Sequence, residues 1–374
     1  MNRPLTDLVR PELLQIALYQ PGKAIEQLQR DLGAYEVIKF ASNENALGPS
    51  PLAMAAAQQA TAHMHRYADA GGLRLRQELA SLLQVTPPHV VLGCGSNELI
   101  LLACQAFLRP GEEAVMHHPS FLMYPIAVMA FGGRAVQVDG PDHGIDLEAM
   151  LEAITPRTRM VFLCSPNNPT GDILTSEQLD GFLRRLPADI AVVLDEAYHE
   201  FANDPAYPNG IERVLRHPER AIVVLRTFSK AHGLASLRIG YGIMDPTLAG
   251  VFDRIRQPFD VNGIAQAAAL ASLQDPDQVP RTIAMTRFGL EQLSHGLRSL
   301  GVHVRPSHGN FLFCQFPTDV RELCRELDAQ GLLVRSLLAF GLDETYARIT
   351  VGLQAENERL LAALRQLLPA SASA

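Results

Sequence analysis

The 374-residue chain contains no tryptophan, five cysteines, and no apolar run of the roughly 18 residues that a membrane-spanning helix needs. Its first residues lack the apolar core of a signal peptide. The cysteines are scattered without paired spacing, so we expect reduced thiols rather than disulfides or metal ligands. These absences predict a soluble, cytoplasmic protein with no membrane contact.

Positive charge is also scarce, because 32 lysines and arginines stand against 40 aspartates and glutamates, for a formal net charge of −8. No long basic run interleaved with aromatic residues is present, so a nucleic-acid partner is not expected. Histidines at 63, 65, 117 and 118 lack a third partner at ligand spacing. We therefore predict no metal site.

Short β-branched runs alternate with helical patterns over residues 89–260, which is typical of a mostly parallel sheet covered by helices. Residues 261–300 read as largely helical. Runs at 302–305, 310–316, 332–337 and 346–351, with helical stretches between and after them, predict a second, smaller α+β unit. The expected class is therefore α/β, in roughly two domains.

Three polar clusters follow apolar runs in the first unit. Residues 165–171 follow one run, 195–198 follow the next, and 227–234 close a third. The carboxyl ends of parallel strands meet at one edge of a sheet, where open α/β sheets bind ligands. We therefore expect these clusters to form one site.

The clusters together resemble those of pyridoxal-phosphate (PLP) aminotransferases of fold type I. The resemblance implies that Lys230 bonds the PLP aldehyde, that Asp195 pairs with the ring nitrogen, and that Asn168 and Tyr198 hydrogen-bond the ring oxygen. Taken alone, each has a plainer interpretation: a solvated lysine, a helix cap, or a turn residue. The ordered set favours the cofactor site.

A glycine-rich turn at 93–98 follows an apolar run and opens a helix, so its free N–H groups could face a phosphate. A tight strand-to-helix turn without ligand is the alternative. Arg238 lies eight residues past Lys230 and could bind the same anion through two N–H groups. The expected phosphate ligands are Gly95, Ser96, Asn97, Thr227, Ser229 and Arg238.

Phe121 stands where this fold carries an aromatic residue that stacks on the PLP ring. An ordinary core phenylalanine fits the sequence equally well.

Within fold type I, the chain is most similar to the histidinol-phosphate aminotransferase family, through segments 19–23, 42–45, 48–51, 66–69 and 348–352. The resemblance implies a homodimer in which Tyr67 reaches the neighbouring subunit's phosphate. It also implies an N-terminal arm at 1–45 that packs with the small domain, a large PLP-binding domain at 46–275, and a small domain at 276–374. The implied substrate-binding residues are Tyr19, Asn45, Arg335 and Arg348.

The expected reaction is a transamination between L-histidinol phosphate and 2-oxoglutarate, with Lys230 carrying the proton at the substrate α-carbon. Ala68, Phe121 and Leu353 depart from the family pattern. Aromatic aminotransferases and threonine-phosphate decarboxylases share most of the same segments, so both remain alternatives. A PLP-binding module without turnover is a further alternative, which Arg335 and Arg348 disfavour unless they are only surface arginines.

Overall fold

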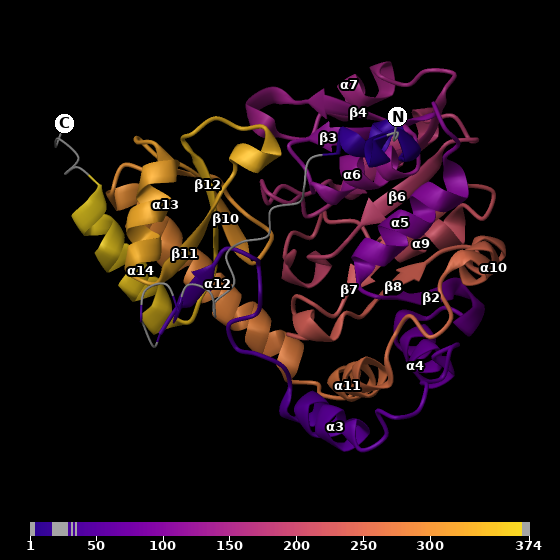
Figure 1. Cartoon of the computed structure of the whole chain (residues 1–374), viewed down its shortest axis with the longest axis horizontal. Helices are drawn as coiled ribbons and strands as arrows, with labels where there is room; N and C mark the ends of the chain where they lie inside the picture. The colour runs from indigo at the N-terminus through magenta and orange to yellow at the C-terminus, as the bar shows by residue number, and fades with distance from the viewer. Residues whose placement is uncertain (1–3, 17–28, 31–32, 34–35, 369–374) are drawn as a thin grey trace.

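The structure is a computed structural model that describes residues 4–16, 29–30, 33 and 36–368. Two sheets, each with its own core, lie side by side, the seven-stranded sheet on the right in Figure 1 and the five-stranded sheet on the left. The predicted α/β class is confirmed.

The large sheet has the strand order β2-β8-β7-β6-β5-β3-β4. Neighbouring strands from β7 to β4 run parallel, whereas β8 is antiparallel to both β2 and β7. Both faces of the sheet are covered, so its central strands are buried along almost their whole length. The strands are β2 (Val90–Gly93), β3 (Glu113–His118), β4 (Arg134–Asp139), β5 (Thr158–Cys164), β6 (Ala191–Asp195), β7 (Ile222–Thr227) and β8 (Gly240–Ile243).

Alternate strand residues point into two separate cores. Val161 and Leu163 pack on one face, and Met160 and Phe162 on the other. The first face is covered by α3 (Pro51–Thr61), α4 (Leu73–Leu83), α7 (Leu147–Glu152), α8 (Ser176–Arg185), α9 (Gly210–Arg216) and α11 (Gly263–Leu273). The second is covered by α5 (Ser96–Phe107), α6 (Met123–Ala130) and α10 (Pro246–Ile255).

The small sheet has the order β1-β11-β12-β10-β9 and is antiparallel except where β1 joins β11. Its strands are β1 (Ile38–Phe40), β9 (His303–Val304), β10 (Phe311–Gln315), β11 (Leu332–Ser336) and β12 (Tyr346–Thr350). Its core includes residues of α12 (Gln278–Ser299), α13 (Val320–Ala329) and α14 (Gln354–Leu367). Short 3-10 helices are η1 (Leu5–Leu8), η2 (Pro87–His89), η3 (Pro141–His143), η4 (His199–Phe201), η5 (Ala235–Leu237) and η6 (Leu338–Phe340).

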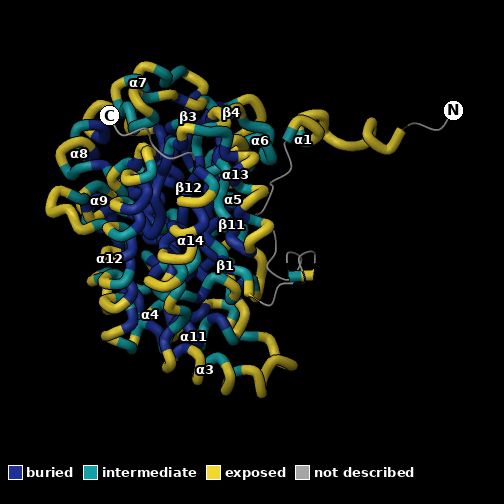
Figure 2. Tube along the Cα trace, turned by 90° about the vertical axis from the view of Figure 1, so that its left-hand side faces the viewer, coloured by how far each residue is buried: buried dark blue, intermediate teal, exposed yellow. Residues whose placement is uncertain are grey.

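The N-terminal segment divides between the two units. Strand β1 completes the small sheet, while α1 (Pro11–Leu14) lies beside α6 and η1 projects away from the body in Figure 2. Arg10 donates a hydrogen bond to the Ala130 carbonyl at the end of α6. We propose the same units as above, an arm at 1–45 and domains at 46–275 and 276–374, with β1 as the part of the arm that joins the small sheet.

Local sequence signals match these elements. Helix α8 begins with the capping box of Thr175 and Gln178, in which each side chain binds the other residue's backbone N–H. Within the described ranges, every helix is too short or too polar to cross a membrane. The same residues contain no group of three or more histidine, cysteine or acidic side chains arranged to hold a metal ion.

Candidate active site

A cavity of about 390 Å³ opens at the carboxyl ends of the central strands of the large sheet. Its lining brings together residues from both sheets and from the segment after β1. Of the residues predicted above, it is lined by Gly95, Ser96, Asn97, Phe121, Asn168, Asp195, Tyr198, Thr227, Ser229, Lys230, Arg238, Arg335 and Arg348.

Lys230 lies in the turn that follows β7 and projects into this cavity. Its Nζ donates a hydrogen bond to the Ser42 carbonyl (3.2 Å) and lies 5.6 Å from the centre of the Tyr198 ring. Burial, followed by the positive charge of Arg348, lowers the pKa of Lys230 to about 7. A lysine with that pKa is substantially neutral at neutral pH, so its nitrogen can act as a nucleophile and as a base.

Asp195 is the last residue of β6 and is almost fully buried. Tyr124 donates a hydrogen bond to its Oδ2 (2.8 Å), and the Ala197 N–H donates to its Oδ1 (3.1 Å). Burial outweighs these donors and raises the pKa of Asp195 to about 6. A cationic ligand nitrogen beside this carboxylate would be stabilised by it.

Tyr124 was not identified from the sequence. It lies on α6, three residues after Phe121, and stacks on Phe162 with ring centres 4.6 Å apart. In the sequence it is one aromatic residue of an apolar helix, and only the fold brings its hydroxyl to Asp195.

Tyr198 and Asn168 lie on the side of the cavity nearest the small sheet. The Tyr198 hydroxyl accepts a hydrogen bond from the Asn43 amide (2.9 Å), and its ring meets Phe311 edge-on. Arg348 donates to the Asn168 side-chain oxygen, which leaves the amide NH₂ group to donate into the cavity.

An anion site forms where α5 begins. Gly95 has φ +76°, and a Cβ atom there would lie 2.8 Å from Nη2 of Arg238. The guanidinium thus lies against the turn whose N–H groups start the helix. Ser229 directly precedes Lys230, and its Oγ lies 2.9 Å from the hydroxyl oxygen of Thr227. Helix N-terminus, guanidinium and hydroxyls together suit a phosphate.

Arg335 and Arg348 are register partners on neighbouring strands, β11 and β12. Arg348 is buried, donates to the Ala41 carbonyl (2.7 Å), and lies 5.5 Å over the Phe311 ring. Two arginines directly opposite each other repel unless an anion lies between or beside them. They form a second cationic region of the cavity.

Four predicted residues need separate mention. Phe121 lines the cavity and packs edge-on against Tyr124. Asn45 does not line it: its amide holds the Ala231 carbonyl and the Thr282 hydroxyl, and Asn43 is the asparagine of that segment that faces the cavity. Tyr67 is outside this chain's cavity and highly exposed. Tyr19 lies outside the described residues.

Residues 35–364 match the family model for class I and II aminotransferases. The chain belongs to this family. The resemblance drawn from the motifs is thereby confirmed.

Individual aminotransferases are similar over almost the whole chain. The histidinol-phosphate aminotransferase of Moorella thermoacetica is 42% identical over 359 residues, covering 96% of this chain and 92% of the relative. Histidinol-phosphate aminotransferase 2 of Pseudomonas fluorescens is 43% identical over 370 residues, covering 98% and 99%. The crystal structure of the Sinorhizobium meliloti histidinol-phosphate aminotransferase in complex with pyridoxal-5'-phosphate superposes with a TM-score of 0.86, at 30% identity, over 96% of this chain and 98% of that one.

Proposed function

We propose that this aminotransferase transfers the amino group of L-histidinol phosphate to 2-oxoglutarate, giving imidazole acetol phosphate and L-glutamate, a step of histidine biosynthesis. The observation that carries the proposal is the pair Arg335 and Arg348 in the same cavity as Lys230. Both proposed substrates carry an anion away from the reacting carbon, and a planar guanidinium can bind phosphate or carboxylate through two N–H groups. The names of relatives at 42–43% identity support the same substrate.

We propose PLP as the cofactor, because three features of the cavity fit its three polar parts. The poorly solvated Lys230 amine suits the aldehyde. Buried Asp195, whose hydrogen-bond partners are neutral donors, suits a protonated ring nitrogen. The turn at Gly95, whose missing side chain admits the Arg238 guanidinium, suits the phosphate.

When bound, PLP supplies an electron sink that stabilises negative charge at the substrate α-carbon. The residues of this chain prepare that chemistry. Asp195 would hold a proton on the ring nitrogen, and the Tyr124 hydroxyl keeps the carboxylate oriented. The Lys230 amine, whose pKa of about 7 leaves a large neutral fraction at neutral pH, could accept the proton from the substrate α-carbon and donate it to the carbon that carried the PLP aldehyde. Tyr198 and Asn168 would hydrogen-bond the ring oxygen.

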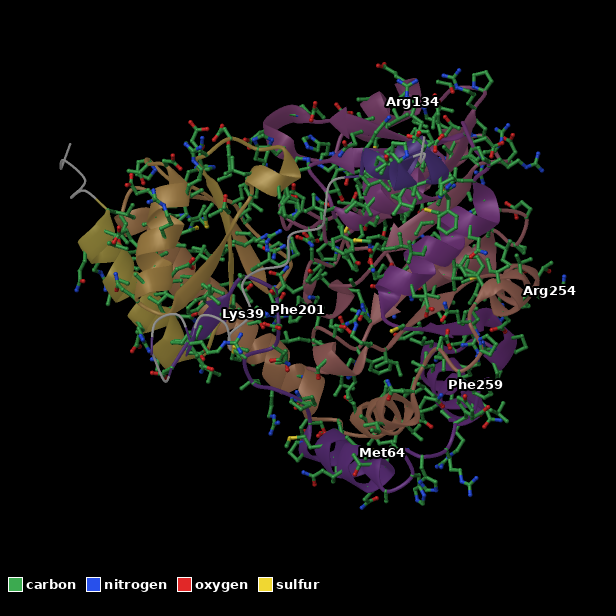
Figure 3. The ribbon with its side chains drawn as sticks, in the orientation of Figure 1. Lys39, Met64, Arg134, Phe201, Arg254 and Phe259 are labelled. Carbon is green, nitrogen blue, oxygen red and sulfur yellow. The ribbon has the colours of Figure 1, made fainter. Side chains whose placement is uncertain are left out.

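We propose that the active unit is a homodimer. Tyr67 is 84% exposed and stacks on Phe259, with ring centres 4.5 Å apart. Met64 is also exposed on this face, and Figure 3 labels Met64 and Phe259 around the α3, α4 and α11 region. An exposed aromatic pair beside apolar side chains suits a protein interface. Tyr67 would then reach the phosphate of the partner's cofactor.

We also propose a cytoplasmic location. All five cysteines are free thiols, and Cys104, Cys164 and Cys314 are buried, which suits a reducing compartment.

A single-turnover screen tests the substrate. The PLP-loaded enzyme is mixed separately with histidinol phosphate, phenylalanine, tyrosine and phosphothreonine, and loss of the absorption band of bound PLP is followed. We expect histidinol phosphate to react with the highest kcat/KM. Faster reaction of phenylalanine would replace the proposal with an aromatic aminotransferase, and carbon dioxide release from phosphothreonine would replace it with a decarboxylase.

A further inference from the structure

His118 lies outside the cavity and contacts a segment that lines it. It ends β3, and its Nδ1 lies 2.6 Å from the carboxylate of Asp139, its register partner at the end of β4. Its Nε2 lies 2.8 Å from the carbonyl oxygen of Phe340 in η6. Phe340 lines the cavity. One imidazole therefore connects the large sheet to a cavity-lining segment of the small unit.

Both partners of the His118 ring are hydrogen-bond acceptors. A carboxylate and a carbonyl can each be satisfied only if both ring nitrogens carry hydrogen, and only the imidazolium has both. When one proton is lost, the other stays on Nδ1, because the charged carboxylate of Asp139 is the stronger acceptor. Nε2 would then turn a lone pair toward the Phe340 carbonyl, and the contact would become repulsive.

The packing at this contact is close. Gly341 has φ +80°, and a Cβ atom there would lie 2.8 Å from Nε2 of His118. Leu122, in the segment that follows His118, packs against buried Phe313, Leu337 and Phe340. The segment at 338–341 is thus seated directly on the large unit at this point.

Other contacts also cross the boundary between the two units. Arg305 Nη2 binds Asp172 (3.0 Å), and His143 meets the Tyr346 ring edge-on at 5.0 Å. Burial lowers the pKa of His117 to about 4, so that ring stays neutral. The titratable groups next to His118 are Asp139, which contacts its ring, and His117, its neighbour in the chain. Beyond His117 lie His143 and the charged or titratable groups around it and around Arg305, which are Asp142, Asp172, Asp343 and Tyr346.

We propose that His118 is a positioning residue whose imidazolium fastens residues 338–341 over the cavity, so that affinity for the amino donor falls as the ring loses its proton. Histidine changes charge between pH 5 and 8 more readily than any other side chain. Because β11, which carries Arg335, leads into η6, loosening this segment also loosens the proposed anion site. The kinetic part of this proposal, the change in affinity for the amino donor, rests on the proposed function. The structural part, the fastening of residues 338–341 by His118, does not.

The structural part is tested by fluorescence. The chain has no tryptophan, so Leu338→Trp places one fluorophore in the segment. We expect its emission to shift to longer wavelength between pH 5.5 and 8.5. His118→Gln should abolish the shift, because an amide can donate to the Phe340 carbonyl at every pH. Asp139→Asn should abolish it too, because an amide there can donate to Nδ1 and leave the hydrogen on Nε2. His118→Phe should give the long-wavelength emission throughout.

The kinetic part is tested by the pH dependence of KM for histidinol phosphate in wild type and in His118→Gln, because the substrate's own ionisation affects both proteins equally and cancels in the ratio of their KM values. Glu148→Gln is the control, since it removes an exposed carboxylate that pairs only with Arg185 among the contacts described. We expect KM to rise severalfold with pH in wild type while kcat changes less, and His118→Gln to flatten the rise. His143→Gln should keep the wild-type profile.

The outcomes separate the two hypotheses. If emission and the KM profile keep their wild-type pH dependence in both His118→Gln and His118→Phe, the positioning role is wrong. If emission behaves as expected but histidinol phosphate is not turned over, the positioning role stands and the proposed substrate fails.

Discussion

At the scale of single residues, burial has opposite effects on the two central groups of the site. It favours the neutral form of both, so it lowers the pKa of Lys230 to about 7 and raises that of Asp195 to about 6. The neutral amine is what the reaction needs. The carboxyl group of Asp195, by contrast, is needed in its charged form, and a cation beside it favours that form. The protonation state of Asp195 is therefore coupled to the binding of a cationic ligand.

Lys230 should reduce the stability of the cofactor-free protein in a pH-dependent way. Its folded-state pKa is below the unfolded value, so the cost is full below about pH 7, where the amine is charged in both states, and disappears above the unfolded value of 10.5. Lys230→Met should therefore raise the free energy of unfolding at pH 6 by roughly 2–4 kcal/mol, and much less near pH 10. Urea denaturation of both proteins at both pH values measures this. Equal stability of wild type and Lys230→Met at pH 6 would contradict the shift.

Asp195→Asn should leave the protein folded but slow the reaction by orders of magnitude. A neutral amide cannot hold a proton on the ring nitrogen, so the loss falls on the transition state and kcat should decrease more than KM rises. Steady-state kinetics with histidinol phosphate, beside circular dichroism of both proteins, is the measurement. A nearly unchanged kcat would refute the proposed role of Asp195.

At the scale of elements, the strand-to-helix turn before α5 depends on a missing side chain. Gly95→Ala would add a Cβ atom 2.8 Å from Arg238 Nη2, at a φ of +76° that disfavours other residues. PLP affinity should fall by at least about tenfold, because the N–H groups and the guanidinium could no longer share one anion. Gly250→Ala on α10 is the matched control, because open space surrounds it and alanine favours helix. Equilibrium titration of PLP fluorescence gives both affinities, and equal affinity in Gly95→Ala and wild type would argue against the site.

The paired strands β11 and β12 give a graded test of the second cationic region. Arg348→Lys should damage both half-reactions, because lysine replaces a planar fork with a point charge and loses the contacts to Asn168 and Ala41. Arg335→Lys should lower the reaction rates of histidinol phosphate and 2-oxoglutarate by about tenfold or more. The rate with phenylalanine should change little, because the phenylalanine side chain carries no anion. Single-turnover rates with the three substrates measure both effects. A uniform loss in Arg335→Lys would mean that this residue is structural.

The sequence was sufficient for elements with strong local signals. The polar clusters at the ends of β5, β6 and β7 lie where the sequence predicted them. Long-range pairings were not: β1 joins β11 across almost 300 residues, and β8 reverses direction between β2 and β7. Pattern and propensity describe neighbours along the chain, whereas such pairings depend on loop closure and packing between distant segments.

The same distinction holds within the candidate site. Asp195 ends a strand, and Lys230 and Asn168 each follow one, so their position was predictable. Tyr124 reaches Asp195 only through the packing of α6, and a helical tyrosine carries no sign of that role. Asn43 and Asn45 belong to one motif, and the sequence analysis predicted Asn45 as the substrate-binding residue. Only the backbone path decides which of the two amides faces the cavity, and it is that of Asn43.

At the scale of the whole molecule, the exposed face around Tyr67 supports the proposed homodimer. Phe259→Asp should dissociate it, because a carboxylate would be buried in an apolar contact. Tyr67→Phe should leave the dimer intact but weaken PLP binding by about 1.5–3 kcal/mol, the value of one hydrogen bond to a charged group. Sedimentation velocity and PLP titration separate the two effects. A fully active monomer would remove the basis for a shared site.

The opposed arginines of β11 and β12 also bear on how long the protein lasts. Together with Arg238 they place three guanidinium groups around one cavity. Their mutual repulsion is relieved whenever phosphate or a dicarboxylate occupies the space, so such ligands bind the folded chain and not the unfolded one. We therefore expect ligand-free enzyme to unfold and be degraded more readily than enzyme with a bound ligand. The concentration of substrate would then help to set the amount of folded enzyme.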